Sequence, residues 1–143
     1  MTKELIEIDG KVILITGVAG FIGSFLAKRL LRDCRPAMIV GIDNLNDYYD
    51  IKLKEKRLAQ IEDCDVDKRF VFRRVDIARK DDLMVLFGEF AFDIVVNLAA
   101  QAGVRYSIDC PDEYIRSNVV GFFNLLEACR RSGERGHFSF LLG

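Results

Sequence analysis

Three glycines near the N-terminus constrain the fold of this chain more than any other sequence feature. They follow residues 12–15, a run of β-branched and aliphatic side chains typical of a strand buried on both faces. In a strand–turn–helix unit, Gly17 would allow the tight turn, Gly20 would let backbone approach a pyrophosphate, and Gly23 would let the helix pack closely on the sheet. Because amides at the start of a helix attract negative groups, the turn predicts a dinucleotide site.

An acidic residue in the expected place supports that interpretation. Residues 38–42 form a second apolar run, and Asp43 ends it about 20 residues after Gly23, where a carboxylate accepts hydrogen bonds from the adenosine ribose. Such a carboxylate favours a free 2′-hydroxyl and repels a 2′-phosphate. Since no Arg or Lys lies between Gly17 and Gly23 to compensate, the sequence favours NAD over NADP as the cofactor.

Strand-like and helix-like segments alternate along the chain. We expect strands at residues 12–15, 38–42, 70–72, 94–98 and 137–142. Helices are expected between them, the third capped by Asp81 or Asp82 and the last running from Pro111 to about Arg131. With right-handed crossovers, these elements form an α/β fold, a Rossmann-type doubly wound parallel sheet of about five strands in the order 3-2-1-4-5. Residues 1–143 are therefore expected to form one NAD-binding domain.

Helical periodicity also predicts which side chains face the sheet. The expected inward residues are Ile22, Phe25, Leu26 and Leu30 in the first helix, and Leu83, Leu86 and Phe87 in the third. In the last helix they are Val119, Phe122, Phe123, Leu126 and Cys129. The second helix, residues 51–61, mixes Leu53, Leu58 and Ile61 with many charges and is expected to lie at the surface.

Charge and composition exclude several classes of protein. The chain carries 21 Lys and Arg against 22 Asp and Glu, a formal net charge of -1, so it lacks the positive field of a nucleic-acid or membrane-surface binder. Its longest uncharged stretch, residues 12–27, is too short and too rich in glycine to span a bilayer. The four cysteines have no CxxC spacing and there is one histidine, so we expect no metal site and the reduced thiols of a cytoplasmic protein.

Four motifs carry a resemblance to a known family: TGVAGFIGS, VGIDNLNDYYD, NLAAQAGVRYS and SNVVGFFNLLEACR. They resemble the extended short-chain dehydrogenase/reductases, the NAD-dependent nucleotide-sugar epimerases and dehydratases, and among these the UDP-glucuronate 4-epimerases. The resemblance implies the NAD-binding part of an isomerase that transfers hydride through a 4-keto sugar. It implies a cofactor site of Gly17, Gly20, Phe21, Ile22, Gly23, Asp43, Asn44, Asn46, Asp76, Ile77, Leu98, Ala99, Ala100 and Asn118, and a sugar-nucleotide loop that includes Gln101 and Arg105.

Several of these roles have a plainer alternative. The resemblance places the ribose on residues 43–46, the adenine beside Asp76, and the central part of the cofactor along residues 98–100. Residues 98–100 are equally suited to the core at a strand end, and Asp76 to capping a turn. Arg105 is as well suited to a surface ion pair with Asp109 or Asp112, and Asn118 to packing support.

The resemblance also implies a catalytic pair that we do not find. Family members use a tyrosine one helical turn before a lysine, after the fifth strand, and the lysine lowers the pKa of the tyrosine. The sequence given stops at that strand, so we expect a truncated domain without a substrate domain, inactive alone and with no catalytic residue assigned. Tyr48 and Lys52 have the right spacing but follow Asp43 closely, so we interpret them as a helix start.

Two other interpretations remain open, together with an expectation about assembly. The chain is also consistent with a non-catalytic dinucleotide-binding module, or with a truncated remnant that folds by associating with another polypeptide. A sheet that ends at its fifth strand has an open apolar edge, and such edges recruit partners. We therefore expect a homo-oligomer, formed through that edge or through the last helix.

Overall fold

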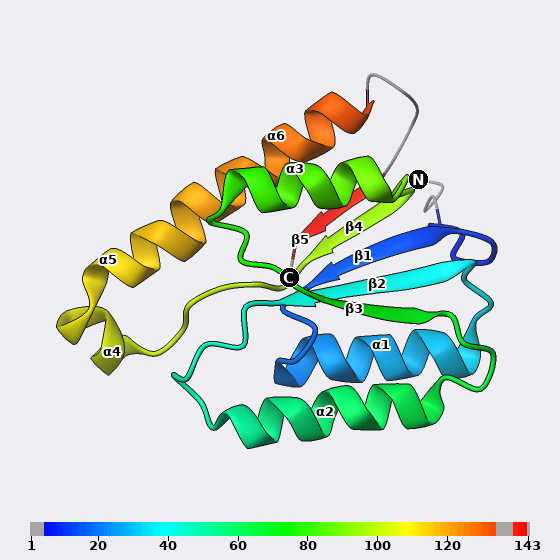
Figure 1. The fold of residues 1–143 in the computed structure, drawn as a ribbon, viewed down its shortest axis with the longest axis horizontal. Coiled ribbons are helices and arrows are strands. Elements are labelled where there is room, and N and C mark those ends of the chain that lie inside the picture. The colour runs from blue at the N-terminus through cyan, green and yellow to red at the C-terminus, as the bar shows by residue number, and fades with distance from the viewer. Residues whose placement is uncertain (1–4, 134–138, 143) are drawn as a thin grey trace.

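The computed structural model of the chain describes residues 5–133 and 139–142. In chain order its elements are β1 (Val12–Thr16), α1 (Phe21–Asp33), β2 (Met38–Asp43), α2 (Ile51–Cys64), β3 (Phe70–Arg74), α3 (Lys80–Glu89), β4 (Ile94–Asn97), α4 (Val104–Asp109), α5 (Pro111–Tyr114), the π-helix η1 (Ile115–Gly121), α6 (Phe122–Gly133) and β5 (Ser139–Leu142). Figure 1 shows a sheet between two helical layers, with α3 and α6 on one face and α1 and α2 on the other.

The sheet has five parallel strands in the order β3-β2-β1-β4-β5, which confirms the predicted topology. Leu14, in the central strand, lies opposite Val40 of β2 and Val95 of β4. Because all the strands run the same way, their carboxyl ends meet at one edge of the sheet, toward which the arrowheads in Figure 1 point. In folds of this type, ligands bind at that edge, where the strand order reverses.

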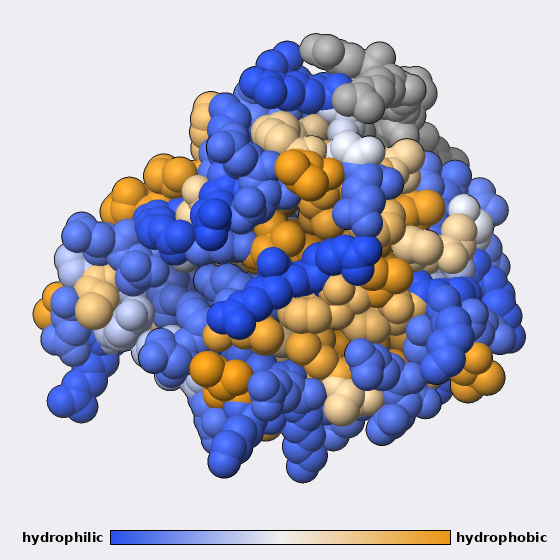
Figure 2. Space-filling model, in the orientation of Figure 1, coloured by the Kyte–Doolittle hydropathy of each residue, from blue (hydrophilic) through white to orange (hydrophobic). Residues whose placement is uncertain are grey.

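Alternate residues of the central strands build two separate apolar cores. Leu14 and Val95 belong to the core under α3 and α6, whereas Ile13, Ile39 and Ile94 belong to the core under α1 and α2. This division follows from the pleat, which directs successive side chains to opposite faces. Strand β3 lies at one edge of the sheet, where residues 70–72 are half-buried and residues 73 and 74 are exposed. Figure 2 shows apolar surface between the helical layers on this side of the molecule.

The predicted inward face of α1 is wrong at Ile22 and Phe25, whereas Leu26 and Leu30 are half-buried and pack against the core as predicted. Ile22 is 65% exposed and Phe25 is 59% exposed, while Gly23, Ser24, Ala27 and Leu31 are buried. The helix packs so closely against the glycine turn and the sheet that most of the side chains on its buried face are small. Periodicity could not choose between the two faces, because both carry apolar residues at helical spacing.

The last helix deviates from the prediction in the same way. It is divided into α5, η1 and α6, and Val119, Phe123 and Leu126 are exposed rather than buried. The buried residues of η1 and α6 are Gly121, Asn124, Leu125, Ala128 and Cys129. Of the predicted set, Cys129 is buried as expected and Phe122 is half-buried. The wider π-helical turn changes the phase of the helix, and again the small residues face the core.

The remaining helices agree better with the sequence. In α3, Leu83, Leu86 and Phe87 are buried as predicted, although the N-cap is Arg79 and the two predicted capping aspartates lie in the first turn. Helix α2 begins after Asp50, whose carboxylate accepts a hydrogen bond from the Lys52 amide at 2.9 Å. The start of the predicted fifth strand, residues 137 and 138, lies outside the described residues, as do the side chains of β5.

Candidate functional site

The turn after β1 has the geometry that its three glycines predict. Gly17 adopts a φ of 67°, and a Cβ there would lie 2.8 Å from the carbonyl oxygen of Leu98. A Cβ on Gly23 would press on the carbonyl oxygen of Gly17, so only glycine lets α1 approach this closely. Gly20 is the N-cap of α1 and has no side chain that could accept hydrogen bonds from the first-turn amides. These amides therefore begin the helix at the edge of the sheet where an anion can approach.

Asp43 is held beside this turn by three donors. Its side chain is 8% exposed. Oxygen Oδ2 accepts a hydrogen bond from the Ala19 amide at 3.2 Å, and Oδ1 accepts one from the Leu45 amide at 2.8 Å. The Lys54 ammonium lies 3.5 Å from Oδ1. The carboxylate at the end of β2 is thus oriented by backbone from both sides and paired with a cation.

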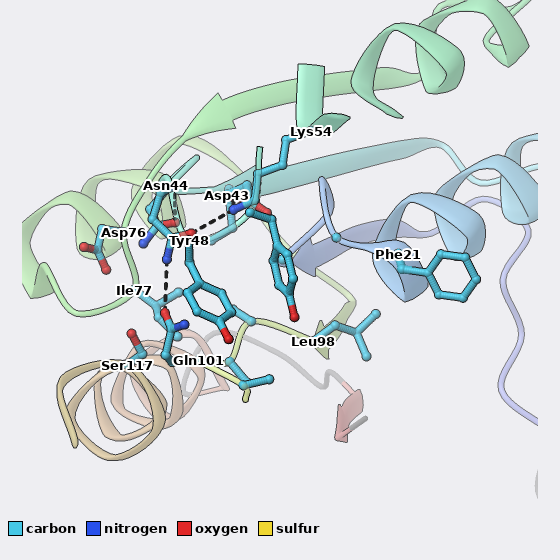
Figure 3. A pocket seen from close by; sticks show the side chains of 18 of the residues that line it. Phe21, Asp43, Asn44, Tyr48, Lys54, Asp76, Ile77, Leu98, Gln101 and Ser117 are labelled. Carbon is cyan, nitrogen blue, oxygen red and sulfur yellow. Dashed lines mark hydrogen bonds and ion pairs between the residues drawn. The ribbon is translucent and has the colours of Figure 1, made fainter. Parts of the chain in front are cut away.

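A chain of hydrogen bonds joins the loops that follow β2 and β4. The Lys54 ammonium donates to the side-chain oxygen of Asn46 at 3.0 Å, and the side-chain nitrogen of Asn46 donates to the side-chain oxygen of Gln101 at 3.2 Å. The backbone amide of Gln101 donates to the side-chain oxygen of Asn118 at 2.8 Å, and the side-chain nitrogen of Asn118 donates back to the backbone carbonyl of Gln101 at 3.0 Å. Figure 3 shows Asp43 and Lys54 at one end of this chain and Gln101 at the other. Asn118 therefore positions the loop after β4.

The carboxyl edge of the sheet carries a cleft of about 450 Å³. Most of the predicted site residues line it: Gly17, Gly20, Phe21, Asp43, Asn44, Asn46, Asp76, Ile77, Leu98, Ala99, Ala100 and Gln101. Four predicted residues do not line the cleft. Ile22 and Arg105 are exposed, Gly23 is buried against the turn, and Asn118 lies behind Gln101. Their roles remain predictions.

Asp76 caps a turn, as one interpretation of the sequence predicted, and its role beside the adenine stays a prediction. It lines the cleft, and it also closes a turn, because its Oδ1 accepts a hydrogen bond from the Ala78 amide at 2.9 Å. Its other oxygen pairs with Arg116 of η1 at 2.6 Å, a partner that the sequence did not suggest. This ion pair ties the end of β3 to the helix above the cleft.

Sequence reasoning missed several residues that line the cleft, chiefly Tyr48, Tyr49, Lys54, Arg57 and Ser117. A signal for Lys54 was available. Lys54, Leu58 and Ile61 follow the i, i+4, i+7 spacing of a buried helical face, and all three are buried. A lysine in an apolar stripe rarely lacks a partner, and here the partners are Asp43 and Asn46.

All four tyrosines of the sequence lie in one cluster of rings, and two of them, Tyr48 and Tyr49, line the cleft. The ring of Tyr48 lies 4.7 Å from that of Tyr49 and 4.5 Å from that of Tyr106, and the Tyr114 hydroxyl donates to the Gly103 carbonyl. A hydrogen bond with Cys110 raises the pKa of Tyr106, and burial raises the pKa of Tyr114. These two phenols therefore stay protonated at neutral pH.

The Tyr48–Lys52 pair does not form an acid–base unit. Tyr48 lies in the loop before α2, whereas Lys52 is exposed on the first turn of that helix and does not line the cleft. Among residues 5–133 and 139–142, no group of three or more His, Cys, Asp or Glu is arranged to hold a metal ion. Within the same residues, no helix has the length and apolar character needed to cross a membrane.

A parallel five-stranded sheet with a glycine turn after its first strand and a cleft at its carboxyl edge defines a Rossmann-type fold. The family described as GDP-mannose 4,6 dehydratase matches residues 14–142. The chain belongs to this family, which confirms the resemblance drawn from the four motifs.

Two relatives show which proteins this chain is similar to and how much of their length it covers. Protein CapI of Staphylococcus aureus is 51% identical over 118 residues, which cover 82% of this chain and 34% of that protein. UDP-glucuronate 4-epimerase 4 of Arabidopsis thaliana is 43% identical over 122 residues, 85% of this chain and 26% of that protein. The chain thus spans about a third or less of the length of these relatives.

Solved structures of two epimerases have a similar fold. One is a variant of UDP-glucuronic acid 4-epimerase from Bacillus cereus in complex with UDP-4-deoxy-4-fluoro-glucuronic acid and NAD. The match has a TM-score of 0.75 and 34% sequence identity, and covers 92% of this chain and 39% of that one. The UDP-glucose 4-epimerase of Thermus thermophilus, solved with NAD, matches with a TM-score of 0.66 at 35% identity over 85% of this chain and 34% of that one.

Proposed function

We propose that this chain binds NAD in the cleft and is the cofactor-binding part of a nucleotide-sugar epimerase that acts on UDP-glucuronate. The observation that carries the proposal is the position of the Asp43 carboxylate, which lies within hydrogen-bond reach of the glycine turn and lines the same cleft. Relatives named UDP-glucuronate 4-epimerase, and a structure of such an enzyme with NAD, support the choice of cofactor and sugar.

The cleft suggests how the cofactor would lie. The pyrophosphate would rest on the amides that follow Gly17 and Gly20, at the start of α1. The ribose would bond to Asp43, Asn44 and Asn46, and the adenine would lie against Asp76 and Ile77. Leu98, Ala99 and Ala100 would contact the central part of the cofactor.

The sugar nucleotide would approach the loop after β4. Gln101 is the polar side chain of that loop in the cleft, and Asn118 holds its backbone. Arg105, exposed on α4, would meet the sugar nucleotide from outside the cleft. When bound, NAD accepts a hydride from the sugar and returns it, and the chain's own residues hold the reactants in place.

We also propose that this stretch of chain does not epimerise a sugar alone. Lys52 does not line the cleft, and Lys54, which lies there with Tyr48 and Tyr49, donates to Asn46 and pairs with Asp43. Within the described residues no lysine is therefore bonded to a tyrosine hydroxyl. The test is turnover of UDP-glucuronate by the purified chain, with a full-length UDP-glucuronate 4-epimerase as the positive control. Formation of the C4 epimer above the blank rate would contradict this part of the proposal.

Self-association is the proposed mode of assembly. Ile115, Val119, Val120, Phe123 and Leu126 are exposed along η1 and α6, and such a contiguous apolar surface favours a partner. Sedimentation velocity at micromolar concentration should show a dimer or larger species, and Phe123→Glu should shift it toward the monomer. A wild-type chain that sediments as a monomer would contradict the proposal.

We also propose a cytoplasmic location. The free state of all four thiols supports it, because thiols stay reduced in that compartment.

Calorimetric titration with NAD tests the cofactor proposal. We expect one saturable binding event per chain, weakened about tenfold or more in Asp43→Ala because hydrogen bonds to a charged group are lost. Asp33→Ala is the matched control, since Asp33 lies at the far end of α1 and pairs there with Arg29 and Arg32. Binding by this control should stay within about twofold of the wild type. Absence of NAD binding by the wild-type chain would refute the proposal.

A further inference from the structure

A lysine is buried at the ribose end of the cleft. Lys54 is 7% exposed, in the second turn of α2. Its ammonium lies 3.0 Å from the side-chain oxygen of Asn46 and 3.5 Å from the carboxylate of Asp43. In Figure 3 its side chain extends from α2 toward Asp43. A residue 11 positions beyond Asp43 in the sequence thus brings a positive charge to the acid that ends β2.

The donors of Lys54 are not all used. An ammonium group has three N–H donors. Asn46 accepts one and Asp43 is the nearest acceptor for a second, and among the described residues no third acceptor lies within hydrogen-bond distance. Because Lys54 lines the cleft, a hydroxyl or phosphate oxygen beside Asp43 could accept the remaining hydrogen.

The ion pair changes the electrostatics of the ribose site. An unpaired carboxylate at the end of β2 would repel a 2′-phosphate strongly. With the Lys54 ammonium beside it, the local net charge is close to zero, and the repulsion is partly offset. The expectation that no cation compensates Asp43 considered only the residues between Gly17 and Gly23, and it did not anticipate a lysine brought in by α2.

We propose that Lys54 is a positioning and specificity-determining residue of the ribose site. It fixes the Asp43 carboxylate and the Asn46 amide where they meet the ribose hydroxyls, and its charge sets how strongly the site discriminates between a free 2′-hydroxyl and a 2′-phosphate. The inference rests on the proposed function, because it assumes that the cleft holds the adenosine ribose of a dinucleotide.

The test compares NAD and NADP on three forms of the full chain: wild type, Lys54→Met and Lys52→Met. NAD is titrated directly, and NADP is measured by competition against bound NAD. Lys54→Met should weaken NAD binding about tenfold and NADP binding at least ten times more than that, so that the ratio of the two dissociation constants rises about tenfold or more. Lys52→Met removes the same charge from an exposed site on the same helix and should leave both affinities within about twofold.

The ratio separates a specificity role from a merely structural one. If Lys54→Met weakens both dinucleotides by the same factor, or if NADP fails to compete on the wild type, the inference is overturned while NAD binding stands. If the wild type binds neither dinucleotide, the proposed function fails first, and the inference with it. Lys54→Arg keeps the charge and should hold the ratio near the wild-type value. Lys54→Gln removes the charge but keeps a polar side chain, so it serves the same comparison if Lys54→Met does not fold, and an unchanged ratio in Lys54→Gln overturns the inference.

Discussion

Replacing Thr16 by valine should weaken the junction that holds the cleft together. Thr16 is the last residue of β1 and is fully buried. Its hydroxyl donates to the Asn97 side chain at 2.6 Å and accepts hydrogen bonds from the amides of Leu98 and Ala99, both at 3.0 Å. One side chain therefore fixes the start of the loop after β4 against the glycine turn. Thr16→Val keeps the shape of the side chain and removes all three hydrogen bonds.

The magnitude follows from counting these bonds. Each neutral hydrogen bond contributes about 0.5–1.5 kcal/mol net, so the loss of three bonds lowers the free energy of unfolding by about 3 kcal/mol. The Asn97 side chain and the amides of Leu98 and Ala99 would also lose their partner, and unsatisfied buried groups add to that loss. That loss is a large fraction of the 5–15 kcal/mol, roughly, by which a domain of this size is stable. Dinucleotide binding should weaken as well, because Leu98 and Ala99 line the cleft.

Urea unfolding followed by circular dichroism measures the loss. Thr16→Ser is the matched control, since it keeps the hydroxyl and removes only a methyl group, at a cost of about 1 kcal/mol. The reasoning predicts that valine is clearly more destabilising than serine. If Thr16→Val unfolds within about 0.5 kcal/mol of the wild type, or if serine is as harmful as valine, the hydrogen bonds do not stabilise the junction.

Three further predictions concern single residues. Gly23→Ala should lower the free energy of unfolding in urea by about 2 kcal/mol or more, because the new Cβ would press on the Gly17 carbonyl. An unchanged free energy of unfolding would contradict the close approach of α1. Asn118→Ala should speed amide hydrogen exchange at Gln101 about tenfold, and unchanged exchange would mean that Asn118 does not hold the loop. Burial raises the pKa of the Cys129 thiol to about 12, so it should react with a disulfide reagent at pH 8 only after denaturant is added. That pKa lies above the unfolded value of 9.0, so burial of the neutral thiol stabilises the fold below pH 9, and this contribution is lost as the pH rises toward 12. Cys129→Ala should lack this loss of stability. Rapid reaction of the thiol in the native protein would refute the assignment.

The sheet could be predicted from the sequence because its signals are local. Residues 12–15 and 38–42 are continuous apolar runs, and residues 94–98 form a third that only Asn97 interrupts. The structure has strands at each of them. Right-handed crossovers, together with the glycine turn of a Rossmann-type unit, then predict the strand order. Helix faces were harder to predict, since α1 and the last helix carry apolar residues on two sides. Small residues, Gly23 in α1 and Gly121 in η1, face the core in both, and periodicity of hydrophobicity alone does not report close approach.

The candidate site shows the same division between local and long-range information. Gly17 and Asp43 were found because each lies at a fixed place in a strand–turn–helix unit. Lys54 lines the cleft and pairs with Asp43, and Arg116 pairs with Asp76 from η1. Neither contact follows from spacing along the chain. A lysine within a buried helical stripe was the one clue available, and it indicated burial without naming the partner.

A crystal structure of this chain grown with NAD tests the central claim most directly. The account predicts electron density for the pyrophosphate over the amides after Gly17 and Gly20, with the adenosine ribose hydroxyls bonded to the Asp43 carboxylate. Clear density for NAD anywhere else, or a crystal saturated with NAD in which this cleft contains only solvent, would contradict it.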